Sequence, residues 1–169
     1  MTNRKKFNFI DLFAGCGGMS LGLENAGFEP VYVNELNPDA LETYMVNRRD
    51  DYQDLEHFQS QNIKELVRNN NQGLKNLKKK FINHGIDPNE IDLIVGGPPC
   101  QGYSGIGHRR LHAVDKLDIP ANKLYKDMAK VIEFFQPRIF LFENVKGLHS
   151  ARWRKDGEKG EIFKDVYKT

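Results

Sequence analysis

Cys100 is the residue of this sequence whose surroundings most favour covalent chemistry. It directly follows Gly97, Pro98 and Pro99. Because proline restricts the backbone and has no amide donor, the cysteine is expected to be held in one orientation. A thiolate in such a position could act as a nucleophile. The alternative for any single cysteine is a buried small apolar residue, and we assign Cys16 to that class.

Two acidic residues stand where apolar runs end. Glu143 directly follows Ile139 to Phe142, where burying an unpaired carboxylate would be costly. It is therefore either exposed at the end of a strand or held for chemistry with a raised pKa. Glu35 follows another apolar run and lies about 20 residues after Gly15, a spacing at which an acid can accept both hydroxyls of a ribose.

A glycine cluster follows the first apolar run of the chain. Gly15, Gly17 and Gly18 come just after Phe13, and glycines let a backbone approach a ligand closely. The cluster is not the GxGxxG pattern of dinucleotide binding, so it favours a nucleoside without a pyrophosphate. S-adenosyl-L-methionine fits that description. A plain tight turn, with Glu35 exposed to solvent, is the alternative.

The elements that must position these residues alternate between strands and helices. Apolar runs predict strands over residues 7–13, 30–34, 91–95 and 138–143. Helical spacing predicts helices over residues 19–26, 38–48, 74–81 and 122–135, with a break at 69–71 and a long loop over 102–120. Strand, helix, strand is the signature of a parallel sheet, whose carboxyl edge binds ligands. Cys100 and Glu143 both end strands at that edge, so they can face one cavity.

Composition excludes several classes of protein. The 169 residues suit one domain, and 25 Lys+Arg against 23 Asp+Glu leave a net charge of +2, too small to suggest a polybasic protein. No apolar run is long enough to span a membrane, and the start does not resemble a signal peptide. The cysteines form no CxxC pair and the histidines show no ligand spacing, so we expect no metal site. These features predict a reduced, cytoplasmic protein.

Five segments resemble successive motifs of the DNA cytosine-5 methyltransferases. They cover residues 11–24, 34–44, 92–104, 121–138 and 142–148, in the order and at the spacing of that family. The resemblance implies an α/β fold with a Rossmann-like, doubly wound and mostly parallel sheet of the S-adenosylmethionine-dependent methyltransferase type. Residues 1–169 would form the N-terminal part of the catalytic domain, in a cytoplasmic bacterial enzyme that associates with the nucleoid when on DNA.

The resemblance also implies a mechanism. Cys100 would add to carbon 6 of a cytosine flipped out of double-stranded DNA, while Glu143 would donate a proton or a hydrogen bond to ring nitrogen 3. Carbon 5 would then take the methyl group of S-adenosyl-L-methionine. Loss of the carbon 5 proton and expulsion of Cys100 would release 5-methylcytosine.

Binding residues follow from the same resemblance. The cofactor would contact Phe13, Ala14, Gly15, Cys16, Gly17, Glu35, Leu36, Asn62, Ile63, Gly97, Pro99 and Leu124. DNA would contact Gln101, Ser104, Arg109 and Arg110. Asn62 replaces an acid that the family uses to accept from the adenine amino group, and an amide oxygen can still accept. The basic clusters at 78–80 and 152–155 are either phosphate contacts or solvated surface.

The resemblance stops after Glu143-Asn144-Val145. The family's Gln-x-Arg-x-Arg motif, target-recognition region and last motif are absent from the 169 residues. We therefore expect a sheet that is incomplete at its C-terminal strands, with one side of 139–142 unpaired. The chain would be the catalytic half of a longer or two-chain enzyme, of restriction-modification type, completed by a complementary chain. A non-catalytic module that binds the cofactor or docks a partner, and an RNA cytosine-5 methyltransferase, remain alternatives.

Overall fold

The computed structural model describes residues 6–99, 119–154 and 156–169. Its strands are β1 (Phe7–Leu12), β2 (Phe28–Asn34), β3 (Gln59–Ser60), β4 (Leu93–Gly96) and β5 (Ile139–Phe142). Its α-helices are α1 (Gly18–Asn25), α2 (Pro38–Val46), α3 (Ile63–Asn83), α4 (Leu124–Phe135) and α5 (Glu161–Lys168). Short 3-10 helices are η1 (Gln53–His57), η4 (Pro120–Lys123) and η5 (Lys146–Ser150).

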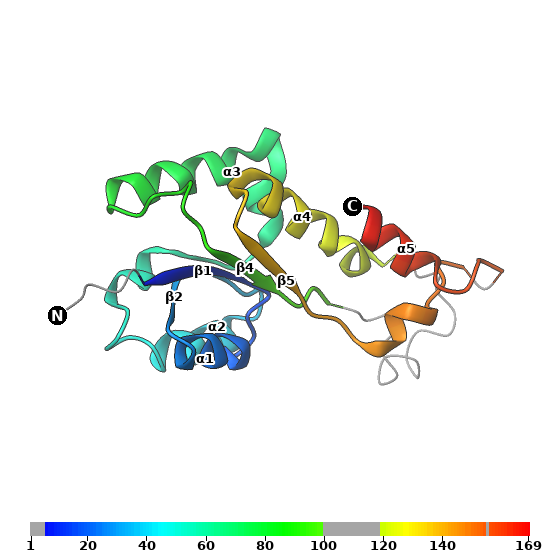
Figure 1. The fold of residues 1–169 in the computed structure, drawn as a ribbon, viewed down its shortest axis with the longest axis horizontal. Coiled ribbons are helices and arrows are strands. Elements are labelled where there is room, and N and C mark those ends of the chain that lie inside the picture. The colour runs from blue at the N-terminus through cyan, green and yellow to red at the C-terminus, as the bar shows by residue number, and fades with distance from the viewer. Residues whose placement is uncertain (1–5, 100–118, 155) are drawn as a thin grey trace.

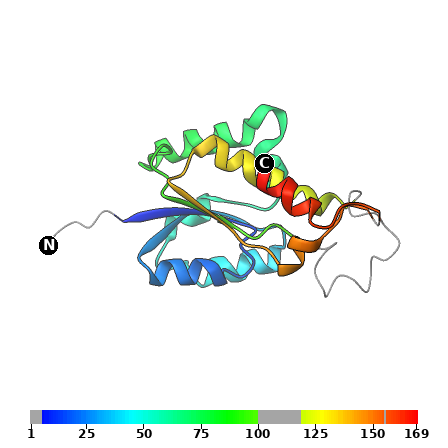
Figure 2. The same cartoon turned by 45° about the vertical axis from the view of Figure 1, so that its right-hand side comes forward.

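The strands form one parallel sheet in the order β3-β2-β1-β4-β5. Helices α1 and α2 cover one face of the sheet, and α3 and α4 cover the other, as Figures 1 and 2 show. The order reverses between β1 and β4, where the chain changes face. The expected doubly wound α/β fold is thus confirmed. Strand β3 was not predicted, because two residues are too short for a recognisable apolar run.

Local signals in the sequence explain several element boundaries. Helix α1 ends just before Gly27, whose φ of 91° is left-handed. Helix α2 begins after Asn37, whose side-chain oxygen accepts the backbone N–H groups of Asp39 and Ala40. Helix α3 is broken as predicted, because Asn69 and the two asparagines after it have left-handed φ angles of 51°, 56° and 60°.

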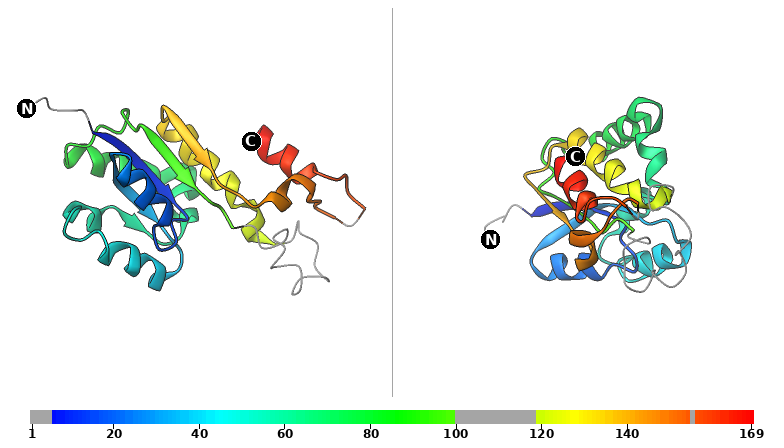
Figure 3. Two further views of the ribbon diagram at one scale, coloured as in Figure 1. Left: turned by 60° about the horizontal axis from the view of Figure 1, so that its bottom comes forward. Right: turned by 90° about the vertical axis from the view of Figure 1, so that its right-hand side faces the viewer.

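The sheet is held between two layers of apolar side chains. On the α3 and α4 side, Ile10 and Ile94 belong to a buried core that includes Phe81 and Met128. Figure 3 shows a further part, in which η5 and α5 lie beside the start of α4, away from the strands. A separate apolar cluster that includes Trp153 holds these elements together. No helix in the described residues is long and apolar enough to cross a membrane.

Strand β5 forms one edge of the sheet and pairs only with β4 in the described part of the chain. Three of its apolar side chains are exposed, with 66% of Ile139, 58% of Phe140 and 45% of Leu141 accessible to solvent. The expectation of an apolar strand with one unpaired side is therefore confirmed for the described residues.

Candidate functional site

The ends of all the strands are aligned at one edge of the sheet. In the strand register, Leu12 pairs with Asn34 and with Gly96, and Gly96 pairs with Phe142. On the other side, Asn34 pairs with Ser60. The residues that follow these ends therefore form the next row along the carboxyl edge, where open α/β sheets bind ligands.

A cavity of about 340 Å³ opens at this edge. It is lined by residues from the ends of β1, β2, β3 and β4 and from the starts of α3, η4 and α4. Eight positions predicted for the cofactor line it, namely Phe13, Glu35, Leu36, Asn62, Ile63, Gly97, Pro99 and Leu124. Four further lining residues were not predicted, namely Asn34, Gln61, Lys64 and Ala121. The volume lies within the range of small-molecule sites, which begins at about 300 Å³.

Glu35 is oriented by two backbone donors. Its Oε2 accepts the N–H of Gly15 at 2.8 Å, and its Oε1 accepts the N–H of Asn37 at 2.8 Å. A carboxylate has about four acceptor positions, so about two remain for a ligand. The side chain is partly buried and lines the cavity, which excludes the alternative of a fully solvated acid.

The glycine turn comes close to the end of β2. The backbone N–H of Ala14 donates to the carbonyl of Asn34 at 3.1 Å. Phe13 adopts a left-handed φ of 59°, a strained conformation for a bulky residue that is more common at functional sites. Its side chain lines the cavity, whereas Ala14, Gly15, Cys16 and Gly17 form the turn beside it.

The expected burial of Cys16 is wrong, since its side chain is exposed. Cys16 lies between Gly15 and Gly17, both of which have left-handed φ angles, of 56° and 89°. The turn directs this side chain toward solvent and not into the core. Cys16 belongs to the turn only through its backbone.

Asn34 was overlooked in the sequence and connects two strand ends. Its buried amide nitrogen donates to the carbonyls of Ser60 at 3.1 Å and Gln61 at 3.0 Å. It therefore fixes the segment after β3 beside Glu35. A polar residue at the end of an apolar strand was the only available signal.

The walls of the cavity are largely apolar on the side of Leu36, Ile63 and Leu124. Leu36 is 65% exposed at the rim, where an apolar side chain is available to a flat ligand. Asn62 lies nearby and caps α3, because its Oδ1 accepts the N–H of Lys64 at 3.1 Å. One lone pair of that oxygen is therefore used, as is usual for a helix cap.

Glu143 lies at the same edge, next to the segment after β4. Its backbone N–H donates to the carbonyl of Gly96 at 2.9 Å. A Cβ built on Gly97 would come within 2.7 Å of Oε2 of Glu143, so the carboxylate lies over that glycine. Asn144 donates to the carbonyl of Pro98 at 3.2 Å. The side chain of Glu143 is exposed in this structure.

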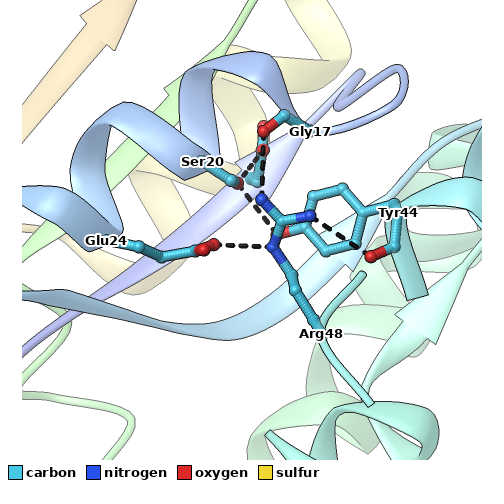
Figure 4. A network of polar contacts seen from close by, with 6 residues as sticks. Gly17, Ser20, Glu24, Tyr44 and Arg48 are labelled. Atoms are coloured by element: carbon cyan, nitrogen blue, oxygen red, sulfur yellow. Dashed lines mark hydrogen bonds and ion pairs between the residues drawn. The ribbon is translucent and has the colours of Figure 1, made fainter. Parts of the chain in front are cut away.

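A buried polar network contacts the turn at Gly17 (Figure 4). Ser20 donates to the carboxylate of Asp11, and its hydroxyl lies 2.8 Å from that of Tyr44. Arg48 joins Glu24 of α1 at 2.6 Å. Burial raises the pKa of Asp11 to about 7, although the hydrogen bond from Ser20 and the charge of Arg48 oppose this. The motifs at 11–24 and 34–44 contain every member of this network except Arg48, but the sequence does not show that these side chains contact one another.

The C-5 cytosine-specific DNA methylase family matches this chain over residues 7–168. The chain belongs to this family. The Rossmann-like fold described above is accordingly the fold of a methyltransferase. In the part of the chain described by the structure, no group of three or more potential metal ligands is found.

Several type II methyltransferases are similar to this chain. M.AgeI of Thalassovita gelatinovora is 35% identical over 141 residues, which cover 83% of this chain and 28% of M.AgeI. M.HpaII of Haemophilus parainfluenzae is 32% identical over 164 residues, which cover 96% of this chain and 36% of M.HpaII. The chain thus spans about half the length, or less, of the curated relatives that it matches.

Solved structures agree with the fold. A protein from E. coli, described as a DNA modification methyltransferase encoded within a prophage, has a TM-score of 0.65 and 29% identity. The match covers 96% of this chain and 37% of that chain. The Dnmt2 methyltransferase of S. pombe has a TM-score of 0.51 at 18% identity, covering 97% of this chain and 40% of that one, and shows likeness of fold.

The predicted nucleophile and the residues predicted to contact DNA lie outside the described part of the chain. They are Cys100, Gln101, Ser104, Arg109 and Arg110. The basic cluster at 78–80 is described, and Lys78 and Lys80 are engaged with Asn89 and with the carbonyl of His57. For these two lysines the structure favours the interpretation as helix surface.

Proposed function

We propose that this chain is the cofactor-binding and nucleophile-bearing part of a DNA cytosine-5 methyltransferase. The observation that supports this most directly is the cavity at the carboxyl edge of the sheet. Its lining includes most of the positions that the family resemblance implies for S-adenosyl-L-methionine. These positions are scattered between Phe13 and Leu124 in the sequence, so their convergence on one cavity is an independent observation.

The residues of the cavity fit a nucleoside. The carboxylate of Glu35 has unused acceptor positions beside the glycine turn, where it would accept the two hydroxyls of a ribose. Leu36 and Ile63 offer apolar contacts for a base. Asn62, at the start of α3, would face the polar edge of that base. Phe13 and Gly97 would border the methionine part.

Catalysis would use Cys100, which follows the cavity-lining Pro99 in the sequence, and Glu143. When bound, S-adenosyl-L-methionine would supply the methyl group for carbon 5 of cytosine. The Sγ of Cys100 would form a bond to carbon 6 and would be expelled when the product is released. Glu143 would donate to ring nitrogen 3 and stabilise the charge that develops as the thiolate adds. In support, Pro99 lines the cavity directly before Cys100, and the carboxylate of Glu143 lies over Gly97.

The proposed substrate is a cytosine flipped out of double-stranded DNA. The family and the relatives named above favour DNA over RNA, and their type II character favours a restriction-modification setting in the cytoplasm. Base flipping is required because carbon 6 is inaccessible within a stacked duplex. Gln101, Ser104, Arg109 and Arg110 would contact the nucleic acid.

Recognition of the target sequence would come from residues outside these 169. The relatives contain much sequence that has no counterpart in this chain. The free edge of β5, with its exposed Ile139 and Leu141, is where a complementary segment or a complementary chain would extend the sheet.

Covalent trapping tests this proposal. The chain would be mixed with cofactor, with the C-terminal part of a related methyltransferase and with duplex DNA containing 5-fluorocytosine. Fluorine at carbon 5 cannot leave as a proton does, so the bond between sulfur and carbon 6 persists and a denaturation-resistant adduct forms. We expect an adduct with the wild type and with Cys16→Ser, and none with Cys100→Ser. The two variants are matched, because the chain has only two cysteines.

Three outcomes would contradict the proposal. Failure of the wild-type chain to bind S-adenosyl-L-methionine in calorimetry would contradict the assignment of the cavity as the cofactor site. Cofactor binding without an adduct on any nucleic acid would support a non-catalytic binding module. An adduct formed on RNA and not on DNA would support an RNA cytosine-5 methyltransferase.

A further inference from the structure

Arg48 has all three guanidinium nitrogens engaged inside the protein. Its Nε donates to Oε1 of Glu24 at 2.6 Å, and its Nη1 donates to the carbonyl of Tyr44 at 3.2 Å. Its Nη2 donates to the carbonyl of Gly17 at 3.0 Å. The side chain is only 4% exposed, and Figure 4 shows it between α1 and the end of α2.

Further contacts restrain this guanidinium. It stacks on the ring of Tyr44, with 3.9 Å between its central carbon and the ring centroid. Glu24 is itself only 15% exposed, so the pair is shielded from water. A buried charge that lost one of these partners would remain poorly compensated. The arrangement is therefore rigid compared with an ion pair on the surface.

The side chains of Arg48 and Tyr44 pack closely against the glycine turn at Gly17. A Cβ built on Gly17 would lie 2.6 Å from Nη1 of Arg48 and 2.7 Å from Cδ2 of Tyr44. The φ of Gly17 is also left-handed, at 89°. Only glycine can adopt this φ angle and leave room for the side chains of Arg48 and Tyr44. The turn is thus shaped to fit the guanidinium.

Two backbone hydrogen bonds connect Gly17 with Glu35, the proposed ribose acceptor. Gly17 donates its N–H to the carbonyl of Ala14 at 3.0 Å, closing the turn. Within that turn, the N–H of Gly15 donates to Glu35 at 2.8 Å. A shift of Gly17 would therefore move the donor that aims the carboxylate. Arg48 does not itself line the cavity.

We propose that Arg48 is a positioning residue for the cofactor site, acting through Gly17 and Gly15 on the carboxylate of Glu35. This inference rests on the proposed function, since it assumes that Glu35 binds the ribose. It assigns the buried arginine a role in discriminating ligands with both ribose hydroxyls from those that lack one. A purely structural role would lower stability without changing that discrimination.

The test compares the affinities of two probes. They are S-adenosyl-L-homocysteine and its 2′-deoxy analogue, measured by calorimetry with the complete chain. A site built to bind a hydroxyl rejects the analogue that lacks it, so the wild type should prefer the parent compound by about tenfold or more. In Arg48→Lys, the charge opposite Glu24 is kept, but one ammonium cannot reach all three acceptors. We expect the preference to fall below about threefold, as in Glu35→Gln.

A second variant distinguishes an effect on the ligand preference from a general loss of stability. Leu77→Ala, in a buried site of α3, should lower the melting temperature while keeping the wild-type preference. Arg48→Met extends the comparison if it folds, and Arg48→Lys suffices if it does not.

The outcomes distinguish the two proposals. If the wild type binds neither probe, or binds both equally, the role of Glu35 in the proposed function fails and this inference fails with it. If the wild type discriminates and Arg48→Lys discriminates equally well, only the inference about Arg48 is overturned. It is also overturned if Leu77→Ala loses the preference to the same extent.

Discussion

The backbone N–H of Gly15 donates to Oε2 of Glu35 at 2.8 Å. The turn after β1 thus orients the side chain of the acid that follows β2. A second N–H, from Asn37 at the start of α2, holds the other carboxylate oxygen. Two neutral donors thus fix an anion at the mouth of the cavity without neutralising it. Such an acceptor is suited to a ligand that offers a pair of hydroxyls.

Replacing Glu35 by glutamine should weaken binding of S-adenosyl-L-methionine by about 10- to 100-fold, because hydrogen bonds to a charged acceptor are lost. The amide group also places a donor where the ribose or Gly15 requires an acceptor. Titration calorimetry measures the change. Glu42→Gln, on the exposed surface of α2, serves as the control with unchanged affinity. Equal affinities of Glu35→Gln and wild type would contradict the assignment.

Asn62→Asp should tighten binding of the same cofactor by roughly three- to tenfold. The Oδ1 of Asn62 already accepts from Lys64 at the start of α3, and the amide nitrogen beside it is a donor, as is the amino group of adenine. A carboxylate would keep the cap and offer an acceptor to that amino group.

The inosine analogue of S-adenosyl-L-homocysteine provides the matched probe for Asn62. Its base has an acceptor oxygen where adenine has the amino group, so Asn62→Asp should weaken its binding. If the substitution changed the affinities for both bases in the same direction, Asn62 would not contact this edge of the base.

The stability of the protein should fall as the pH rises from about 4 to 7 because of Asp11. Burial raises its pKa from 3.8 to about 7 in the folded protein. Between these values the folded state keeps a proton that the unfolded state has lost, so ionisation favours unfolding. This contribution is greatest below pH 3.8 and is lost by the time the pH exceeds the folded pKa, and its size is up to about 4 kcal/mol.

Chemical denaturation of Asp11→Asn at several pH values measures this contribution. Ser20, Tyr44, Arg48, Glu24 and Glu35 are the groups that act on the carboxyl, and the variant keeps all of them. The difference in unfolding free energy between variant and wild type should change across this range. Asp39→Asn, at the exposed start of α2, should preserve the wild-type pH dependence. An unchanged profile in Asp11→Asn would refute the prediction.

The free edge of β5 should limit the solubility of the isolated chain. Exposed Ile139 and Phe140 lie on a strand with one side unpaired among the described residues, and such an edge is a template for association. Phe140→Lys should raise the concentration at which light scattering begins, while stability changes by no more than about 0.5 kcal/mol. Leu21→Lys, on the equally exposed surface of α1, should have a smaller effect. Equal effects would point to general hydrophobicity and not to the strand edge.

The elements of the fold could largely be predicted from local patterns. The apolar runs of β1, β2, β4 and β5 were recognisable because each lies between turn residues. Asn37 and Pro38 indicated the start of α2, and Asn69 to Asn71 indicated the break in α3. These are effects of backbone conformation, which depend on a few adjacent residues. The end of α2 nevertheless lies two residues before the predicted one, and the first part of α3, which begins at Ile63, was not predicted.

The sequence by itself determined the family motifs and the edge of the sheet at which they would meet, because parallel strands place their carboxyl ends together. Only the tertiary structure decided what lies against each residue. It turned Cys16 outward, joined Asn34 to the segment after β3 and placed Arg48 behind Gly17. Periodicity indicates which side chains are buried, but the partner of a buried side chain depends on how distant helices and strands pack, and no local pattern contains that information.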